Sequence, residues 1–187
     1  MGFLDNLLGK KKKDPVPAGN KTAKAGESGG SGEKKDRIGG FIGFVLLKEA
    51  KWEKQAVLRT LREEWGITPD DTGEDPSKDE DENMAVCWVN GTMCAYSLME
   101  APVPGGEAER FAAANYFWKE AVEVTGTHTA HLLISVMGNE KDPVGAAKLF
   151  TALAASVLPQ PEVLGIYTSG TVFQPEFYLK VAQDLKA

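Results

Sequence analysis

The feature that most constrains the fold is a hairpin signal near the middle of the chain. Two apolar runs, MAVCWV and TMCAYSLM, are joined by Asn90 and Gly91. Asn-Gly in a two-residue loop favours a type I′ turn, because both residues tolerate positive φ. The turn sets the strand register and predicts that Cys87 lies directly opposite Cys94, with Cα atoms about 5.5 Å apart. The two thiols are either small reduced core groups or, under oxidation, the partners of a disulfide.

The hairpin leads into the stretch Ala101–Val124, which reads APVPGGEAERFAAANYFWKEAVEV. Two prolines keep its start extended. From Glu107 onward, apolar residues recur at steps of three and four, which predicts one long helix through the rest of the stretch. These residues occupy more than half of the helix circumference. The helix is therefore either buried on two sides or presents Tyr116 and Phe117 to a partner.

Other segments carry ordinary strand and helix signals. The apolar run FIGFVLL at residues 41–47 predicts a strand covered on both faces. The segment Lys51–Trp65 predicts a helix that ends at Gly66, and Asp142 with Pro143 predicts a helix N-terminus. Two more strands are predicted at Thr127–Met137 and Val163–Tyr167, and a last helix begins with Gln174, Pro175 and Glu176.

The order of these elements is strand, helix, strand, strand, helix, strand, helix, strand, helix. Its first six elements match a split βαββαβ core, and an αβα extension follows. The sequence therefore predicts an α+β fold in which a mixed β-sheet is packed with helices.

Composition divides the chain into three parts. Residues 14–37 are rich in Gly, Lys, Ser, Pro and Glu, which is typical of a disordered linker. The linker joins a short amphipathic and polybasic tail, residues 1–13, to a single α+β domain predicted over residues 38–187. A hydrophobic content of 42% in 187 residues is sufficient for one ordinary core.

Charge and cysteine content restrict the partners and the compartment. The formal net charge of -6 argues against nucleic acid as the main partner, because phosphate binding requires a concentrated basic face. The chain has two cysteines, no cleavable signal pattern and no apolar run of membrane-spanning length, which predicts a cytoplasmic protein.

The tail MGFLDNLLGKKKK has two interpretations. Its apolar residues lie on one face of a short helix and four lysines follow, a pattern that suits weak contact with an anionic membrane surface. The alternative is a frayed soluble tail. The membrane interpretation places the protein at the inner face of the membrane and assigns the contact to Phe3, Leu4, Leu7, Leu8, Lys10, Lys11, Lys12 and Lys13.

Several motifs occur in the order of one known family. FVLLKEAKW, SLMEAPVPGGEAE, NYFW, HTAHLL and GIYTSGTVFQPEFY together resemble the bacterial domain-of-unknown-function family 4261 over Phe41–Tyr178. The resemblance implies a bacterial domain with this extent. It implies no activity, cofactor or catalytic residue, because the family has no established activity.

The sequence contains no nucleophile elbow, Walker loop, dinucleotide fingerprint or zinc spacing. We therefore predict no catalytic residue, no cofactor and no metal site. The acidic segment Thr68–Asn83 lacks the ligand spacing of a calcium loop and is interpreted as a solvated insertion.

Two local features nevertheless suggest a binding site. Asn115, Trp118 and Glu120, with His128 and Tyr167, can form a polar pocket with aromatic walls. Alternatively, Asn115 satisfies loop backbone such as that around Pro102–Gly106.

The second feature is a turn between a strand and a helix. It is either an anion-binding turn or an ordinary one, and it consists of Thr168, Ser169, Gly170 and Thr171. His128 and His131, if both lie on one strand, point to opposite faces and cannot share a metal, and a lone histidine there is more often packed or hydrogen-bonded than catalytic.

Three function classes follow. The preferred one is a non-catalytic protein-binding or adaptor module on a flexible tether, with Tyr116 and Phe117 as anchors; an inhibitor or immunity-type protein is one form of it. The second is a small-molecule-binding or enzymatic domain with a cleft near the central helix and the turn Thr168–Thr171. The third is a structural homo-oligomer subunit. The candidate binding residues are Asn115, Tyr116, Phe117, Trp118, Glu120, His128, Tyr167, Thr168, Ser169 and Thr171.

Overall fold

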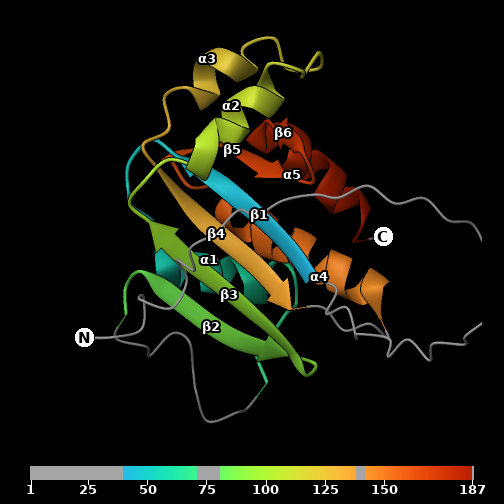
Figure 1. Cartoon of the computed structure of the whole chain (residues 1–187). Helices are drawn as coiled ribbons and strands as arrows, with labels where there is room; N and C mark the ends of the chain where they lie inside the picture. Colours follow the sequence, from blue (N-terminus) through green and yellow to red (C-terminus); the bar gives the residue numbers. More distant parts are fainter. Residues whose placement is uncertain (1–39, 71–80, 138–141, 187) are drawn as a thin grey trace, which may run out of the picture. The chain divides into compact units, whose positions relative to one another are not determined.

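A six-stranded antiparallel sheet forms the centre of the domain in the computed structural model, which describes residues 40–70, 81–137 and 142–186 (Figure 1). The described residues all belong to one compact unit, Asp36–Ala187. The strand order is β2-β3-β4-β1-β5-β6. The strands are β1 (Gly40–Leu47), β2 (Met84–Val89), β3 (Thr92–Met99), β4 (Ala130–Met137), β5 (Val163–Thr168) and β6 (Thr171–Phe173).

β1 lies inside the sheet and is buried on both faces. It pairs with β4 on one side and with β5 on the other. Val45 and Leu47 point into one core and Leu46 into a second core across the sheet, and all three are fully buried. The prediction of a strand covered on both faces is therefore confirmed for this part of the apolar run.

The first face of the sheet is covered by three helices, α1 (Lys54–Glu63), α4 (Pro143–Val157) and α5 (Pro175–Asp184). α1 supplies Val57 and Leu61 to the larger core and α4 supplies Phe150 and Leu153, while the partly buried Tyr178 and Leu179 of α5 pack against it. At the start of α4, Asp142 Oδ1 accepts a hydrogen bond from the Gly145 N–H at 2.8 Å, as the sequence predicts. No described helix is both long enough and apolar enough to cross a membrane.

Among the residues that the structure describes, only a part of the second face is covered by helices. A 3₁₀ turn at Pro104–Gly106 and the short helices α2 (Glu107–Ala112) and α3 (Ala121–Thr125) pack over β1, β5 and β6. In Figure 1, α2 and α3 lie toward β5 and β6, while β2, β3 and β4 have no labelled helix in front of them. The smaller core beneath them contains Leu46, Val103, Ala108, Ala112, Trp118, Ala121, Tyr167 and Val172.

The prediction of one long helix after the hairpin is wrong. α2 ends at Ala112 and α3 begins at Ala121, with a loop at residues 113–120 between them. Helical spacing of apolar residues continues through the loop, but Asn115 bonds to backbone groups outside a helical pattern. Asn side chains compete in this way with the backbone bonds of a helix.

The α+β class is confirmed, whereas the predicted sheet arrangement is corrected. Every described strand pair is antiparallel, so the sheet is not mixed. In a split βαβ unit, β1 and β2 would be parallel with one strand between them. Here β4 and β3 both lie between β1 and β2, and β1 and β2 run antiparallel. The hydrophobic pattern marks which faces of a strand are buried, but it does not choose the neighbouring strand.

Two tight turns set the register of the outer strands. Asn90 and Gly91 have φ of 50° and 73°, and Cys87 pairs with Cys94, as predicted; both thiols are free and buried. Ser169 and Gly170 form a second turn with φ of 51° and 71°. The sequence predicts a strand-to-helix connection here instead, because the three residues of β6 are too few to produce a strand pattern.

Gly43 provides a test of the tight packing between β1 and α4. A Cβ at this position would lie 2.6 Å from Cζ of Phe150. The Phe150 ring is buried and stacks on the Phe41 ring, with centroids 6.0 Å apart. We expect Gly43→Ala to lower the free energy of unfolding by about 1–3 kcal/mol through overpacking. Urea unfolding followed by tryptophan fluorescence measures the change. Gly40→Ala, at the exposed start of the same strand, is the control and should leave the midpoint nearly unchanged; equal midpoints for both variants would contradict the tight contact.

Candidate functional site

The loop at residues 113–120 is held in place by Asn115. Its Oδ1 accepts hydrogen bonds from the N–H groups of Phe117 and Trp118, at 3.0 Å and 3.2 Å. Its Nδ2 donates to the Val172 carbonyl in β6 at 2.6 Å. Asn115 therefore shapes the loop and also ties it to the sheet. The alternative that Asn115 satisfies backbone groups is the one observed, although the groups belong to its own loop and β6 rather than to Pro102–Gly106.

Of the three aromatic residues that follow Asn115, one is buried and two are exposed to solvent. The Trp118 ring is 6% exposed and lies against Gly165 in β5, where a Cβ would be 3.3 Å from the ring. Tyr116 and Phe117 are 82% and 83% exposed, and their ring centroids are 4.3 Å apart. One residue thus anchors the loop, while two large aromatic side chains project into solvent from a fixed backbone.

A continuous row of aromatic rings begins in α2 with Phe111 and runs across the sheet beneath it. Phe111 stacks on Tyr167 at 5.5 Å between centroids, Tyr167 stacks on Phe44 at 5.8 Å, and Phe44 meets His131 edge-on at 5.4 Å. The Tyr167 hydroxyl donates to Glu107 Oε2 at 3.3 Å. Burial, reinforced by the Glu107 carboxylate, raises the pKa of Tyr167, so this hydroxyl keeps its proton and acts as a donor.

Both histidines hold the connection between β3 and α2. The Val103 N–H donates to His128 Nε2 at 2.9 Å, and His128 Nδ1 donates to the Thr125 carbonyl. His131 Nδ1 donates to the Ala101 carbonyl at 2.7 Å. The predicted placement of both histidines on one strand is wrong, because β4 begins only at Ala130. With both ring nitrogens occupied by backbone groups, His128 is a bracing residue.

Glu109 and His128 are the carboxylate and imidazole that come nearest to forming an acid–base pair among the described residues. Its Oε1 lies 3.6 Å from His128 Nδ1, a nitrogen that already donates to Thr125. Glu109 Oε2 is buried without a hydrogen-bond partner among the described residues. The pair therefore lacks the free imidazole nitrogen that general acid–base chemistry needs.

The remaining predicted residues lie at separate positions. Thr168 Oγ1 donates to the Ile42 carbonyl at 3.0 Å, and Thr171 is half-buried in β6. Ser169 is exposed in the β5–β6 turn, and Glu120 is exposed immediately before α3. The predicted membrane-contact residues of the tail lie outside the described residues.

The fold thus brings some of the predicted residues together. Asn115, Trp118 and Tyr167 lie on the same side of the sheet, because Asn115 bonds to Val172, the cross-strand partner of Tyr167. Packed side chains fill the space among them. Tyr116, Phe117, Glu120 and Ser169 are directed to solvent instead.

The second face of the sheet contains a surface that the sequence analysis missed. Where α2 and α3 stop, the outward side chains of β1 to β4 form an uncharged patch, which we call the open sheet face. The signal was present in the hairpin, because Met84, Val86 and Trp88 alternate with a second apolar set on the buried face. The open sheet face consists of Ile42, Met84, Val86, Trp88, Met93, Ala95, Ser97, Met99, Leu133, Ser135 and Met137.

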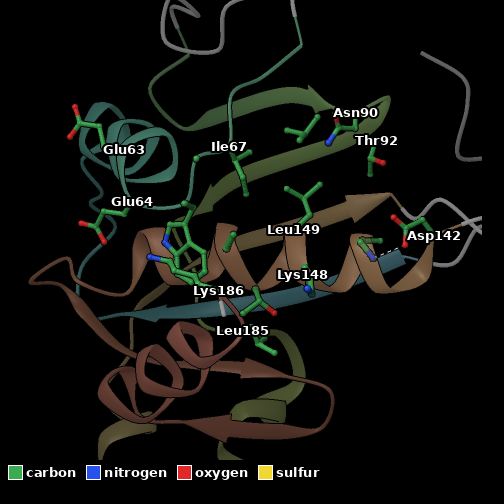
Figure 2. A pocket seen from close by; sticks show the side chains of 17 residues that line it. Glu63, Glu64, Ile67, Asn90, Thr92, Asp142, Lys148, Leu149, Leu185 and Lys186 are labelled. Atoms are coloured by element: carbon green, nitrogen blue, oxygen red, sulfur yellow. Dashed lines mark hydrogen bonds between the residues drawn. The ribbon is translucent and has the colours of Figure 1, made fainter.

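A cavity of about 650 Å³ lies on the first face, between α1, the β2–β3 turn, α4 and the end of α5 (Figure 2). Ile67 and Leu149 contribute to its apolar wall, and Lys186 Nζ lies 4.0 Å from the centre of the Trp65 ring. Carboxylates and lysines line the same cavity, so its charge is mixed. None of the residues that the sequence analysis proposed for binding lines it.

Comparison with known proteins provides no relative, since no family model, curated protein or solved structure matches the chain. The resemblance to family 4261 stays a prediction. Within residues 40–70, 81–137 and 142–186, no group of three or more His, Cys, Asp or Glu side chains is arranged to hold a metal ion.

The pH dependence of stability tests the bracing role of His131. Burial lowers its pKa below 6.5 in the fold, so the unfolded chain binds the proton more readily. The contribution of His131 to stability is complete above about pH 6.5 and decreases as the pH falls below that value. We expect wild type to lose more unfolding free energy than His131→Asn between pH 7.5 and pH 5.

The asparagine keeps an N–H donor for the Ala101 carbonyl but does not titrate. The comparison therefore isolates the effect of imidazole protonation on the unfolding free energy. Urea unfolding at a series of pH values measures both proteins. A constant difference in unfolding free energy across this range would contradict the assignment.

Proposed function

We propose that this chain is a non-catalytic protein-binding module and that the loop at residues 113–120 contacts the partner. The observation that carries the proposal is the pair Tyr116 and Phe117, which are almost fully exposed although Asn115 and Trp118 fix the backbone beneath them. Large aromatic side chains at interfaces often contribute a major share of the binding free energy.

The rigidity of the loop favours binding over an incidental surface contact. Fully burying an apolar side chain contributes about 1.5–3 kcal/mol, so two aromatic rings can supply a substantial part of an affinity. A flexible loop would lose part of this gain through ordering on association. The Asn115 bonds and the buried Trp118 ring order the loop in advance.

Charge indicates the kind of partner. Exposed Lys119, Glu120 and Glu123 follow the aromatic pair, so the local charge is negative by one, and the chain as a whole has a net charge of -6. A basic partner would be attracted to this surface and would associate faster at low ionic strength. An inhibitor or immunity-type role against a basic protein is the form of the proposal that agrees with this charge.

The polar groups inside the domain support a non-catalytic role. His128, His131 and Asn115 bond to backbone atoms, which leaves them as supports of the loop and the β3–α2 connection. The cavity in Figure 2 has mixed charge, and the one buried side-chain atom without a partner in the described residues, Glu109 Oε2, belongs to a residue outside its lining.

The aromatic pair can be tested directly. We expect the double variant Tyr116→Ser, Phe117→Ser to fold like wild type, since both side chains are exposed, and to bind its partner at least about 100-fold more weakly. Full-length protein purified gently from the cells that express it would identify the stoichiometric partner, and titration calorimetry would then compare the variants. Val144→Ser, an exposed apolar residue of α4, is the matched control and should bind normally.

The variant Asn115→Ala tests the ordering of the loop separately from the aromatic contact with the partner. This variant keeps both aromatic rings but removes three backbone bonds, so the affinity should fall by about 5- to 50-fold, with a lower unfolding midpoint. Equal retention of the partner by wild type and the double serine variant would contradict the proposed contact. The absence of any stoichiometric protein from the wild-type preparation would reject the binding module itself.

The tail extends this proposal to a cytoplasmic protein that touches the inner face of the membrane. Residues 1–13 carry the apolar and lysine side chains that such a contact needs. We expect full-length protein to float with anionic liposomes and the protein lacking residues 1–13 to stay in solution. Equal flotation of the two would reject the contact, and neutral liposomes serve as the control.

A further inference from the structure

The open sheet face has an unusual composition for a surface. It contains no charged side chain in a chain whose residues are 26% charged. It also holds every methionine of the sequence except Met1. Ile42 is 56% exposed, Trp88 39%, and Met99 and Met137 45% each.

The size of this surface is significant for a protein of 187 residues. Four strands spaced about 4.8 Å apart, each with about six residues at about 3.3 Å, cover roughly 400 Å². The largest apolar patch of a typical monomer measures about 300–600 Å² and is often functional. The open sheet face therefore has the size of an apolar patch that often has a function.

We propose that the open sheet face pairs with the same face of a second copy of this chain, across a two-fold axis. In such an interface each surface meets itself, so a charged residue near the axis would face its own copy. Two copies with a net charge of -6 each already repel one another. A surface without charge removes the repulsion where the copies come closest.

The partial helical cover of the second face leaves room for this pairing. α2 and α3 form a layer over β1, β5 and β6 that ends before β4, β3 and β2 (Figure 1). A second sheet packs about 10 Å away from the first. With the axis parallel to the strands, strands β2 to β4 of the second copy would continue the layer that α2 and α3 begin.

The side chains suit sheet-on-sheet contact. Ala95, Ser97 and Ser135 on the middle strands are small, which allows close approach. Methionine side chains are flexible and polarizable, so they adapt to an opposing surface. Trp88 lies on the outermost strand and has the largest side chain of the patch. We expect it to contribute the largest share of the binding free energy.

The expected dimer is concentration-dependent. A stable interface of ordinary size buries about 800 Å² on each partner, about twice the strand area estimated above. An interface smaller than the ordinary size is typical of weak association, so we expect the dimer to form only at high protein concentration. This inference does not depend on the proposed role of the loop at residues 113–120, because the loop residues are not part of the open sheet face.

Sedimentation velocity of the full chain between about 1 and 500 µM tests the pairing. We expect the average mass to rise from monomer toward dimer, and Trp88→Glu and Met137→Glu to stay monomeric throughout. Met137 lies at the exposed end of β4, so its replacement keeps the test valid if Trp88→Glu does not fold. Val144→Glu, which adds the same charge to α4 on the first face, should dimerise like wild type.

Salt provides a second criterion. Because the interface is uncharged and the copies repel, 0.5 M NaCl should leave the dimer unchanged or strengthen it, whereas an ionic interface would weaken. A wild-type monomer at every concentration would overturn the proposal. Dimerisation by both glutamate variants, or a different protein bound through Trp88 in place of a second copy, would overturn it as well.

Discussion

The burial of β1 on both faces is the constraint on which the rest of the domain depends. Its fully apolar end can be removed from water only if helices cover both sides of the sheet. α4 covers one side, where Phe150 packs against Gly43, and the α2–α3 region covers the other through Leu46. Both cores therefore include side chains of β1, and also of β5, which supplies Ile166 to the first core and Tyr167 to the second. A change that displaces β1 would disturb the loop at residues 113–120, although that loop is distant in sequence.

The unequal cover of the two faces determines where the two proposed binding surfaces lie. Three helices cover the first face, whereas α2 and α3 have only six and five residues and extend over about half of the second. Short helices have little stability of their own, so these two depend on tertiary contacts. Asn115, His128 and His131 supply them by bonding to the loop, to the β3–α2 connection and to β6. Both surfaces proposed for binding lie at the limits of this thin layer.

The sequence predicted the features that depend on local chemistry. The turn at Asn90 and Gly91, the Cys87–Cys94 register, the N-cap at Asp142 and the double burial of β1 all follow from a few neighbouring residues. Strand order did not follow, because an apolar strand pairs equally well with several neighbours. The open sheet face was missed for a related reason. A strand that is apolar on both sides looks the same whether a helix covers its second face or no helix does.

The region around Asn115 shows why the candidate site was harder to predict than the fold. An amide within an apolar helical pattern is compatible with two physical outcomes, a pocket that binds a ligand or a break in the helix. Only the distance to a backbone carbonyl remote in sequence distinguishes them, and here Nδ2 lies 2.6 Å from the Val172 carbonyl. Once the amide is used in this way, the helix must end, and the next two side chains project outward. The same bond that removes a polar pocket from the interior therefore accompanies the exposed aromatic pair, so the proposed binding surface of this half of the domain follows from the hydrogen bonds of one half-buried amide.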